Sequence, residues 1–369
     1  MKPAMLLLAV WAVALTLPAQ AQNPGLEREL QGVLEVFLQE NSIAPGVAAC
    51  AVCPDLNLDW AGAAGRVALD EPETLTPRHT FRIASNTKTY VAAAALRLVE
   101  MGRLELDQSL GYYLTPAVKA LLENDGYDTG AITIAQVMSH TAGLADHTND
   151  PRFEKIILQE HQHQWTSQEQ LLKLVEWFDP LGDPGQEYVY SDSGYVILGT
   201  IIEKLTGREL GPAVRDLVDY EKLGLEVTYW EYLEEVPAAS GPRAHQYYGQ
   251  EDVTGWNASF DLYGGGGIIT DVRELALFMR ELMQGAVFED DSTLSAMTGR
   301  GSPSYRLGLM VTFFDGRLVI GHQGFWNTFA FHVPSLDLTI GGTVLNHHAT
   351  NGQELARRLV GAAADAAQK

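Results

Sequence analysis

Basic residues are scarce in this sequence of 369 residues. Lysine and arginine number 25 against 47 aspartates and glutamates, which gives a formal net charge of −22 at pH 7. A surface with this excess of acid repels a phosphate backbone and an anionic membrane, so nucleic acid and lipid surfaces are not expected partners. With 46% hydrophobic and 20% charged residues, the chain can still build a packed core.

Cysteine is also nearly absent, since Cys50 and Cys53 are the only two, and a disulfide scaffold is therefore excluded. They lie in a stretch, residues 46–54, that predicts a β-strand ending at a turn. Side chains three residues apart on a strand point to opposite faces, and no further ligands at zinc spacing are present. We expect two separate structural thiols, with a disulfide or redox pair as the alternative.

Long apolar runs are missing except near the start. The run Met5–Leu17 follows Lys2 and is about 13 residues long, whereas a membrane-spanning helix needs about 20. An A-x-A sequence, Ala19-Gln20-Ala21, follows it. Residues 1–21 therefore predict a secretory signal peptide cut after Ala21, and an exported protein of the periplasm or the medium.

The apolar pattern divides the rest of the chain into three parts. It predicts an amphipathic helix at 26–39 and strands at 46–53 and 58–64, and then mostly helices from 85 to about 285. Asp315-Gly316 is a strong type I′ hairpin signal. This turn joins two expected strands, at 309–314 and 317–320. Two further strands are expected at 328–333 and 338–345, and a helix at 353–367.

This order predicts an α+β fold of the α/β class. One antiparallel sheet would be built from both ends of the chain and covered by the terminal helices. The hydrolase domain would span 22–369, with a sheet lobe at 22–84 plus 286–369 and an inserted helical lobe at 85–285. A cleft between two such lobes is the usual place for a small-molecule site.

Several common catalytic motifs are absent. There is no G-x-S-x-G and no H-E-x-x-H, which argues against an α/β-hydrolase elbow and a zinc protease. The four glycines Gly264–Gly267 are not followed by Lys-Ser or Lys-Thr, so we expect a turn rather than a phosphate loop. Asp271 and Glu274 would cap the next helix as a pair. No metal and no organic cofactor are indicated.

Ser85 and Lys88 form an S-x-x-K motif where a helix should begin. A serine becomes a nucleophile only with a base in reach, and positions three apart on a helix share a face. The helix N-terminus favours developing negative charge at Ser85. Because the residues from Tyr90 to Met101 are mostly apolar, Lys88 would be desolvated, which favours the neutral amine of a base. A solvated lysine is the alternative.

Two more stretches carry candidate site residues. Tyr190 precedes a helix with apolar residues at helical spacing, and a tyrosine poised by cations can act as a general acid or base. His322, in Gly321–Trp326 between two expected strands, could hydrogen-bond a substrate or a phenol, and glycine there lets a ligand approach the backbone. Taken alone, the first stretch is better explained by a packing tyrosine and the second by a surface histidine in a hairpin.

Together and in this order, the three stretches resemble the serine β-lactamase and penicillin-recognising DD-peptidase superfamily. Residues 139–144, 190–199 and 264–277 are similar to secondary signatures of its class-C-like branch, and the resemblance covers nearly all of the chain after residue 21. It implies that Ser85 is acylated, that Lys88 is its base partner, and that Tyr190 carries a proton to the leaving group.

The resemblance also implies the substrate-binding residues. His322 and Gly324 match the third motif, which is Lys-Thr-Gly in most β-lactamases and His-x-Gly in certain peptidases and esterases. The backbone N–H groups of Ser85 and Phe325 would form the oxyanion hole. Asp192 stands where class C enzymes carry asparagine. It cannot donate an amide N–H, and beside Lys88 it favours the ammonium, which makes Tyr190 the stronger candidate for the base.

The sequence thus predicts an exported serine hydrolase with an acyl-enzyme on Ser85. The favoured activity is that of a D-alanyl-D-alanine carboxypeptidase or a D-amino-acid peptidase. A β-lactamase, a carboxylesterase of the same fold, and a non-catalytic binding or sensor protein are the alternatives. Small molecules or peptides are the expected partners, and we expect a monomer.

The predicted signal peptide gives a direct test. Expression with export should yield a mature protein that begins at Gln22, because the A-x-A sequence ends at Ala21. N-terminal sequencing of the exported protein checks this. An uncleaved product retained in the cytosol would contradict the prediction.

Overall fold

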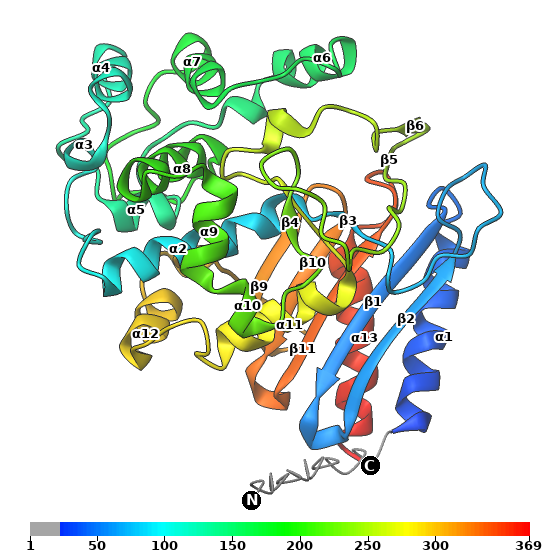
Figure 1. Ribbon diagram of the computed structural model, residues 1–369. Helices are drawn as coiled ribbons and strands as arrows, with labels where there is room; N and C mark the ends of the chain where they lie inside the picture. The colour runs from blue at the N-terminus through cyan, green and yellow to red at the C-terminus, as the bar shows by residue number, and fades with distance from the viewer. Residues whose placement is uncertain (1–22) are drawn as a thin grey trace, which may run out of the picture.

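The computed structural model describes residues 23–369, and the predicted signal peptide and its cleavage site lie outside this range. Figure 1 shows a sheet at one side of the molecule and a group of helices at the other. None of the helices between residues 23 and 369 is both long enough and apolar enough to cross a membrane.

The main sheet has six strands, all antiparallel, in the order β2-β1-β11-β10-β9-β8. Both ends of the chain therefore contribute to one sheet, as expected. The hairpin at Asp315-Gly316 has positive φ at both residues, 49° and 81°, which is the type I′ requirement. The strands are β1 (Gly46–Cys53), β2 (Leu58–Gly65), β8 (Met310–Phe314), β9 (Arg317–Gly324), β10 (Thr328–Val333) and β11 (Leu338–Val344).

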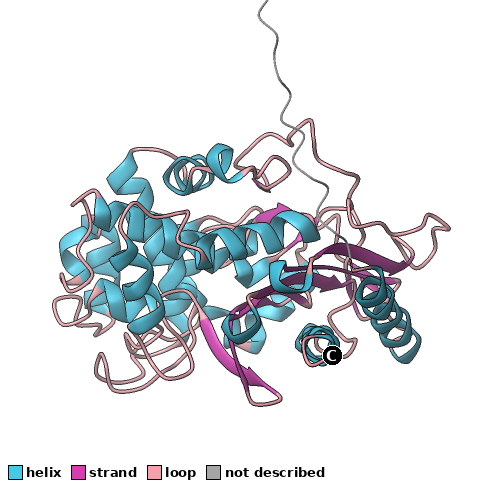
Figure 2. Cartoon of the chain, turned by 90° about the horizontal axis from the view of Figure 1, so that it is seen from below, coloured by secondary structure: helices cyan, strands magenta, loops and turns pink. Residues whose placement is uncertain are grey.

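Helices cover both faces of this sheet (Figure 2). α1 (Pro24–Glu40) and α13 (Gly352–Ala366) pack on one face and against each other. α11 (Val272–Met283) packs on the other face, against β1, β10 and β11. α11 lies within the range expected for the helical lobe, but its apolar stripe is buried on the sheet because Gly341 of β11 leaves room for its backbone.

The turn that precedes α11 differs in part from the expectation. Asp271 caps the helix, accepting from the N–H groups of Arg273 and Glu274. The Glu274 carboxylate does not return to the cap, however. It accepts hydrogen bonds from three successive N–H groups, those of residues 226–228. The predicted cap at Asp271 is therefore present and the predicted contribution of Glu274 is not, since three N–H groups on a distant loop compete for the Glu274 carboxylate.

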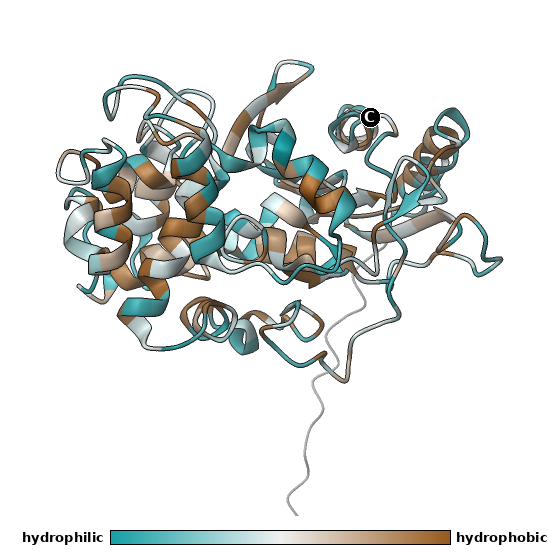
Figure 3. Cartoon of the chain, turned by 90° about the horizontal axis from the view of Figure 1, so that it is seen from above, coloured by the Kyte–Doolittle hydropathy of each residue, from teal (hydrophilic) through white to brown (hydrophobic). Residues whose placement is uncertain are grey.

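The helical part packs around α2 (Thr87–Glu100), which is buried on nearly all sides and contacts α8 (Asp192–Thr206) and α9 (Leu210–Val218). Figure 3 shows that these helices carry both apolar and hydrophilic segments. The remaining helices of this region are α3 (Leu110–Tyr113), α4 (Pro116–Asn124), α5 (Ile134–Met138), α6 (Pro151–Gln159), α7 (Ser167–Trp177), α10 (Tyr220–Leu223) and α12 (Asp291–Gly299).

Short strands join the helical part to the main sheet. β3 (Phe81–Arg82) and β4 (Tyr229–Trp230) pair with opposite edges of β7 (Ile268–Thr270), and β5 (Tyr247–Tyr248) pairs with β6 (Glu251–Asp252). β3 leads directly into a 3₁₀ turn, η2 (Ala84–Asn86), which contacts β9 and β10. η2 thus lies where the sheet meets the helices, and it contains Ser85.

Cys50 and Cys53 are free and buried, and they lie on opposite faces of the main sheet, in two different core clusters. Burial raises the pKa of the Cys50 thiol to about 12. The Cys53 thiol donates to the backbone carbonyl of Leu336. Both side chains therefore act as core residues, as the strand pattern predicts.

This arrangement predicts the behaviour of the two thiols. The folded protein should react slowly with a disulfide reagent such as DTNB, because the buried thiols do not form thiolates at neutral pH. Unfolding in guanidinium without a reductant should release two reactive thiols. A protein that shows none until a reductant is added would contain the disulfide instead.

Candidate active site

Ser85 lies in a strained turn at the start of α2. The preceding residue, Ala84, has φ 45°, in the left-handed region that a non-glycine residue rarely adopts. The Asn86 side chain holds the turn, because its amide donates to Ile83 O at 3.0 Å and to Thr328 Oγ1 at 2.9 Å. Thr328 in β10 also donates to Ile83 O, at 2.8 Å. The turn is thus tied to the sheet and not only to its own helix.

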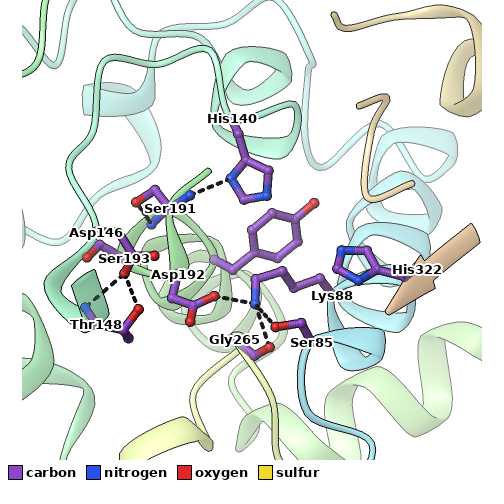
Figure 4. A network of polar contacts seen from close by, with 12 residues as sticks. Ser85, Lys88, His140, Asp146, Thr148, Ser191, Asp192, Ser193, Gly265 and His322 are labelled. Carbon is purple, nitrogen blue, oxygen red and sulfur yellow. Dashed lines mark hydrogen bonds and ion pairs between the residues drawn. The ribbon is translucent and has the colours of Figure 1, made fainter. Parts of the chain in front are cut away.

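Lys88 lies one helical turn further on, with its ammonium beside Ser85 (Figure 4). Its side chain is fully buried. Nζ donates to Ser85 Oγ at 3.0 Å and to the carbonyl oxygen of Gly265 at 2.7 Å, and it forms an ion pair with Asp192. Of the three donors of the ammonium, two are thus hydrogen-bonded, and Asp192 supplies the opposite charge.

Asp192 is the first residue of α8, where a carboxylate is favoured by the helix dipole. Ser191 caps this helix by accepting from Gly194 N, and its hydroxyl donates to Ala145 O at 2.7 Å. The loop before α8 is therefore fixed at both sides. This is how the second motif brings its aspartate to Lys88.

Tyr190 belongs to the same loop and lies against Lys88, whose Nζ is 5.1 Å from the centre of the tyrosine ring. Burial and the Asp192 carboxylate raise the pKa of the Tyr190 phenol well above its usual value, while a hydrogen bond with Ser85 acts in the opposite direction. At neutral pH the phenol is protonated in this state. It can therefore give a proton to a leaving group.

His140 is a neighbour of this group that the sequence did not single out as a site residue. Its ring lies 4.2 Å from that of Tyr190, centre to centre, and its Nδ1 accepts from Ser191 N at 3.1 Å. Burial and the charge of Lys88 lower the pKa of His140 far below its usual value, so the ring is neutral. His140 thus supports the loop that carries Tyr190, by packing against the Tyr190 ring and accepting a hydrogen bond from Ser191. In the sequence, His140 lies among the small residues of 139–144, and nothing in that pattern indicates that its ring supports Tyr190.

His322 is fully buried inside β9 rather than exposed in a hairpin. Burial, and then Lys88, lower its pKa to about 3, so the ring is neutral. Nδ1 lies 2.7 Å from the carbonyl oxygen of Gln323 and therefore carries the proton. Nε2 then accepts from the Tyr305 hydroxyl at 2.8 Å. The phenol contact expected for His322 is present, but with Tyr305, and neither ring nitrogen remains free for a substrate.

Gly324 ends β9 directly against the Ser85 turn. A Cβ at this position would lie 2.2 Å from Ile83 O and 3.1 Å from the Ala84 side chain, so only glycine fits. The next residue, Phe325, lies beside the turn and lines the same cavity as Ser85, with 52% of its side chain exposed. The structure thus brings the third motif to the serine, as the order of motifs predicts.

A cavity of about 280 Å³ opens in front of Ser85. Its walls are largely aromatic, and the charged groups that line it are all acidic. Among the described residues, no lysine, arginine or histidine lines it. The lining residues are Ser85, Thr148, Asn149, Phe153, Glu154, Ile157, Leu158, Asp192, Tyr248, Trp256, Phe260, Asp261, Phe325 and Trp326.

Two further carboxyl groups surround the Lys88–Asp192 pair. Burial and the Asp192 charge raise the pKa of both Asp146 and Asp261. Asp146 accepts two hydrogen bonds from Thr148, at 2.9 Å each. Asp261, in the 3₁₀ turn Ala258–Asp261, faces the cavity. Sequence patterns gave no sign of either residue, because each lies far along the chain from the three motifs.

The sequence and the fold are similar to those of known proteins. The model of the family described as Beta-lactamase matches residues 35–365. A Salmonella paratyphi A protein, whose name gives D-alanyl-D-alanine carboxypeptidase as its assumed activity, is 26% identical over 277 residues. That match covers 66% of this chain and 61% of the relative, so the chain spans about three fifths of the length of the curated relatives it matches.

Solved structures are similar over more of the chain. A D-stereospecific amidohydrolase from a Streptomyces species is 28% identical, with a TM-score of 0.75 over 89% of this chain and 97% of its own. A D-amino acid amidase from Ochrobactrum anthropi SV3 is 19% identical, with a TM-score of 0.78 over 93% and 99%. The second of these shows the fold alone. The predicted antiparallel sheet with terminal helices is thereby confirmed.

Tyr188 and Tyr190 lie in the same stretch of sequence but in different surroundings, so removing their hydroxyl groups should have different effects. Tyr190→Phe should lower the acylation rate by at least ~10²-fold, the lower end of what general acid–base catalysis contributes. Tyr188→Phe is the matched control, because Tyr188 lies against Tyr305 and lines a different cavity. Stopped-flow measurement of acylation in both variants checks this. A larger loss of acylation rate in Tyr188→Phe than in Tyr190→Phe would show that the proton-transfer role belongs to Tyr188 and that our assignment is wrong.

Proposed function

The chain belongs to the Beta-lactamase family, and we propose that it is a serine hydrolase that works through an acyl-enzyme on Ser85. One observation carries the proposal. Tyr190 comes from a different stretch of sequence than Ser85 and Lys88, yet the three side chains lie together behind the cavity that Ser85 lines. Lys88 Nζ is 3.0 Å from Ser85 Oγ and 5.1 Å from the centre of the Tyr190 ring. A buried lysine and a protonated phenol beside a serine suit nucleophilic catalysis.

In the proposed reaction, Ser85 Oγ bonds to the substrate carbonyl carbon. The Lys88 ammonium gives a proton to the Asp192 carboxylate and takes up the serine proton as this bond forms. Tyr190 gives its phenol proton to the leaving group as the bond from that group to the carbonyl carbon breaks, and the proton on Asp192 then returns through Lys88 to Tyr190. The backbone N–H groups of Ser85 and Phe325 would hold the oxyanion. Water then attacks the acyl-enzyme and the same groups reverse the proton movement. No cofactor enters these steps.

Amide bonds of D-amino-acid or peptidoglycan-derived peptides are the proposed substrates. The relative named as a D-stereospecific amidohydrolase and the relative named for D-alanyl-D-alanine carboxypeptidase activity support this class. A β-lactam carries a carboxylate, and the described residues that line the cavity supply no cation for it, because His322 is neutral and buried. Hydrolysis of β-lactams is accordingly the weaker candidate.

We also propose that the protein is exported and monomeric. The signal-peptide pattern of residues 1–21 supports export. A protein of similar fold from Pyrococcus abyssi, 19% identical and named a penicillin-binding protein homologue, is described as octameric, so the monomer needs its own test. Size-exclusion chromatography with light scattering measures the mass of this protein directly.

Replacement of the nucleophile tests the proposal. Ser85→Ala should abolish turnover while the thermal melting curve stays close to that of the unmodified protein, because one hydroxyl is lost from a cavity. A fluorophosphonate probe should add one adduct to the unmodified protein, at Ser85, as located by peptide mass spectrometry. An adduct at another serine, or full activity of Ser85→Ala, would refute the assignment.

A substrate panel separates the remaining candidates. D-amino acid amides, a D-Ala-D-Ala peptide, p-nitrophenyl esters and nitrocefin should be compared by kcat/KM. We expect nitrocefin to fall below the best amide or ester by more than ~10³-fold, since ~4 kcal/mol of transition-state binding is lost with an unrecognised carboxylate. Efficient nitrocefin hydrolysis would instead favour a β-lactamase.

A further inference from the structure

The charge balance in front of Ser85 is uneven. Lys88 lies beside three carboxyl groups, those of Asp146, Asp192 and Asp261, and its ammonium is already paired with Asp192 and hydrogen-bonded to Ser85 and Gly265. Asp146 is occupied by Thr148. Asp192 and Asp261 are the two of these that line the cavity.

Asp192 and Asp261 both lie beside the Cβ position of one glycine. A Cβ at Gly265 would lie 3.5 Å from the Asp192 carboxyl carbon and 3.3 Å from Asp261 Oδ1. At Gly266 a Cβ would overlap the Asp261 carboxyl group, at 2.0 Å from Oδ2. The glycine run Gly264–Gly267, which the sequence marks only as a turn, therefore makes the space in which Asp261 approaches Asp192.

Asp261 has no hydrogen-bond partner among the described residues to stabilise its negative charge. Burial and the charge of Asp192 together raise its pKa, and the opposing effects come from the more distant charges of Lys88 and Arg82. Two carboxyl groups that share one cation in a partly desolvated place are unfavourable when both are ionised. A second cation brought in by a ligand would relieve this.

The other walls suit an organic cation. Tyr248, Trp256 and Phe260 line the cavity with Asp261, and aromatic faces attract ammonium groups. Glu154 adds a carboxylate at the rim, where it accepts from the Tyr248 hydroxyl. For a ligand carboxylate, by contrast, every charged residue that lines the cavity is acidic.

We propose that Asp192 and Asp261 form a cation subsite that binds a protonated amine of the substrate close to the reacting carbonyl. The inference rests on the proposed function and narrows its substrates to amides, peptides or esters with an unblocked amino group. The amine can belong to the acyl part, as in an amino acid amide, or to the leaving group, and the experiment distinguishes these two sources.

Three substrates of matched size test the subsite. Phenylalanine p-nitroanilide, used as both enantiomers, carries the amine on the acyl part. The 3-phenylpropanoyl p-nitroanilide lacks it, and the 3-phenylpropanoyl anilide with a 4-aminomethyl group carries it on the leaving group. One amine substrate should exceed the neutral one at least about tenfold in kcat/KM, the scale of a charge-assisted hydrogen bond. The position of its amine identifies the source.

Variants connect this preference to Asp261. Asp261→Asn should reduce the preference for the amine substrate at least about tenfold. Asp365→Asn on α13, an exposed carboxyl group on the far side of the sheet, removes the same charge and should keep the preference. Equal rates for amine and neutral substrates, or an unchanged preference in Asp261→Asn, would overturn the subsite.

A second measurement is independent of turnover. 2-Phenylethylamine should slow fluorophosphonate labelling of Ser85 more than neutral 2-phenylethanol does, and Asp261→Asn should remove the difference. Labelling of Ser85 without any such difference refutes the subsite and leaves the proposed function intact. If Ser85 is not labelled at all, the proposed function fails, and calorimetric titration of both ligands into the unmodified protein and Asp261→Asn decides the subsite alone.

Discussion

The site depends on one buried ammonium. Three segments contact the Lys88 ammonium. Ser85 comes from η2, just before the helix of Lys88, Asp192 from the start of α8, and the Gly265 carbonyl from the loop before β7. Burying a charge is costly unless it is paired and hydrogen-bonded, so these three segments must meet for α2 to pack as it does. The same contacts that satisfy the lysine therefore place the nucleophile, the acidic group and the glycine run around one cavity.

The sequence could predict elements whose signals are local. The strand at 46–53 matches β1, and the Asp315-Gly316 turn has the two positive φ values of the expected hairpin. The proximity of Ser85 and Lys88 follows from helical spacing alone. The expected strand at 317–320 was too short, because β9 continues to Gly324 by pairing with β10, and a run rich in glycine and polar residues does not look like a strand.

What the sequence could not predict comes from contacts between distant segments. Asp261 and Asp146 join the site only because the 3₁₀ turn Ala258–Asp261 and the loop after α5 fold towards Lys88. His322 is neutral because burial and the charge of Lys88 lower its pKa, and Tyr305 and Gln323 occupy its two ring nitrogens. A sequence motif does not show how far a side chain is removed from water. The charge of a buried side chain depends on the groups that surround it in the folded protein.

The strand order has a consequence for how the chain reaches its final form. β1 lies between β2 and β11, so one edge of the first hairpin stays unpaired until residues 338–344 are available. Pairing of segments nearly three hundred residues apart makes folding slow and leaves an open strand edge for a long time. For a chain made from its N-terminus at about 5–20 residues per second, the sheet closes only near the end of synthesis. A nascent chain that has not yet folded is the form that a transport channel for unfolded proteins accepts.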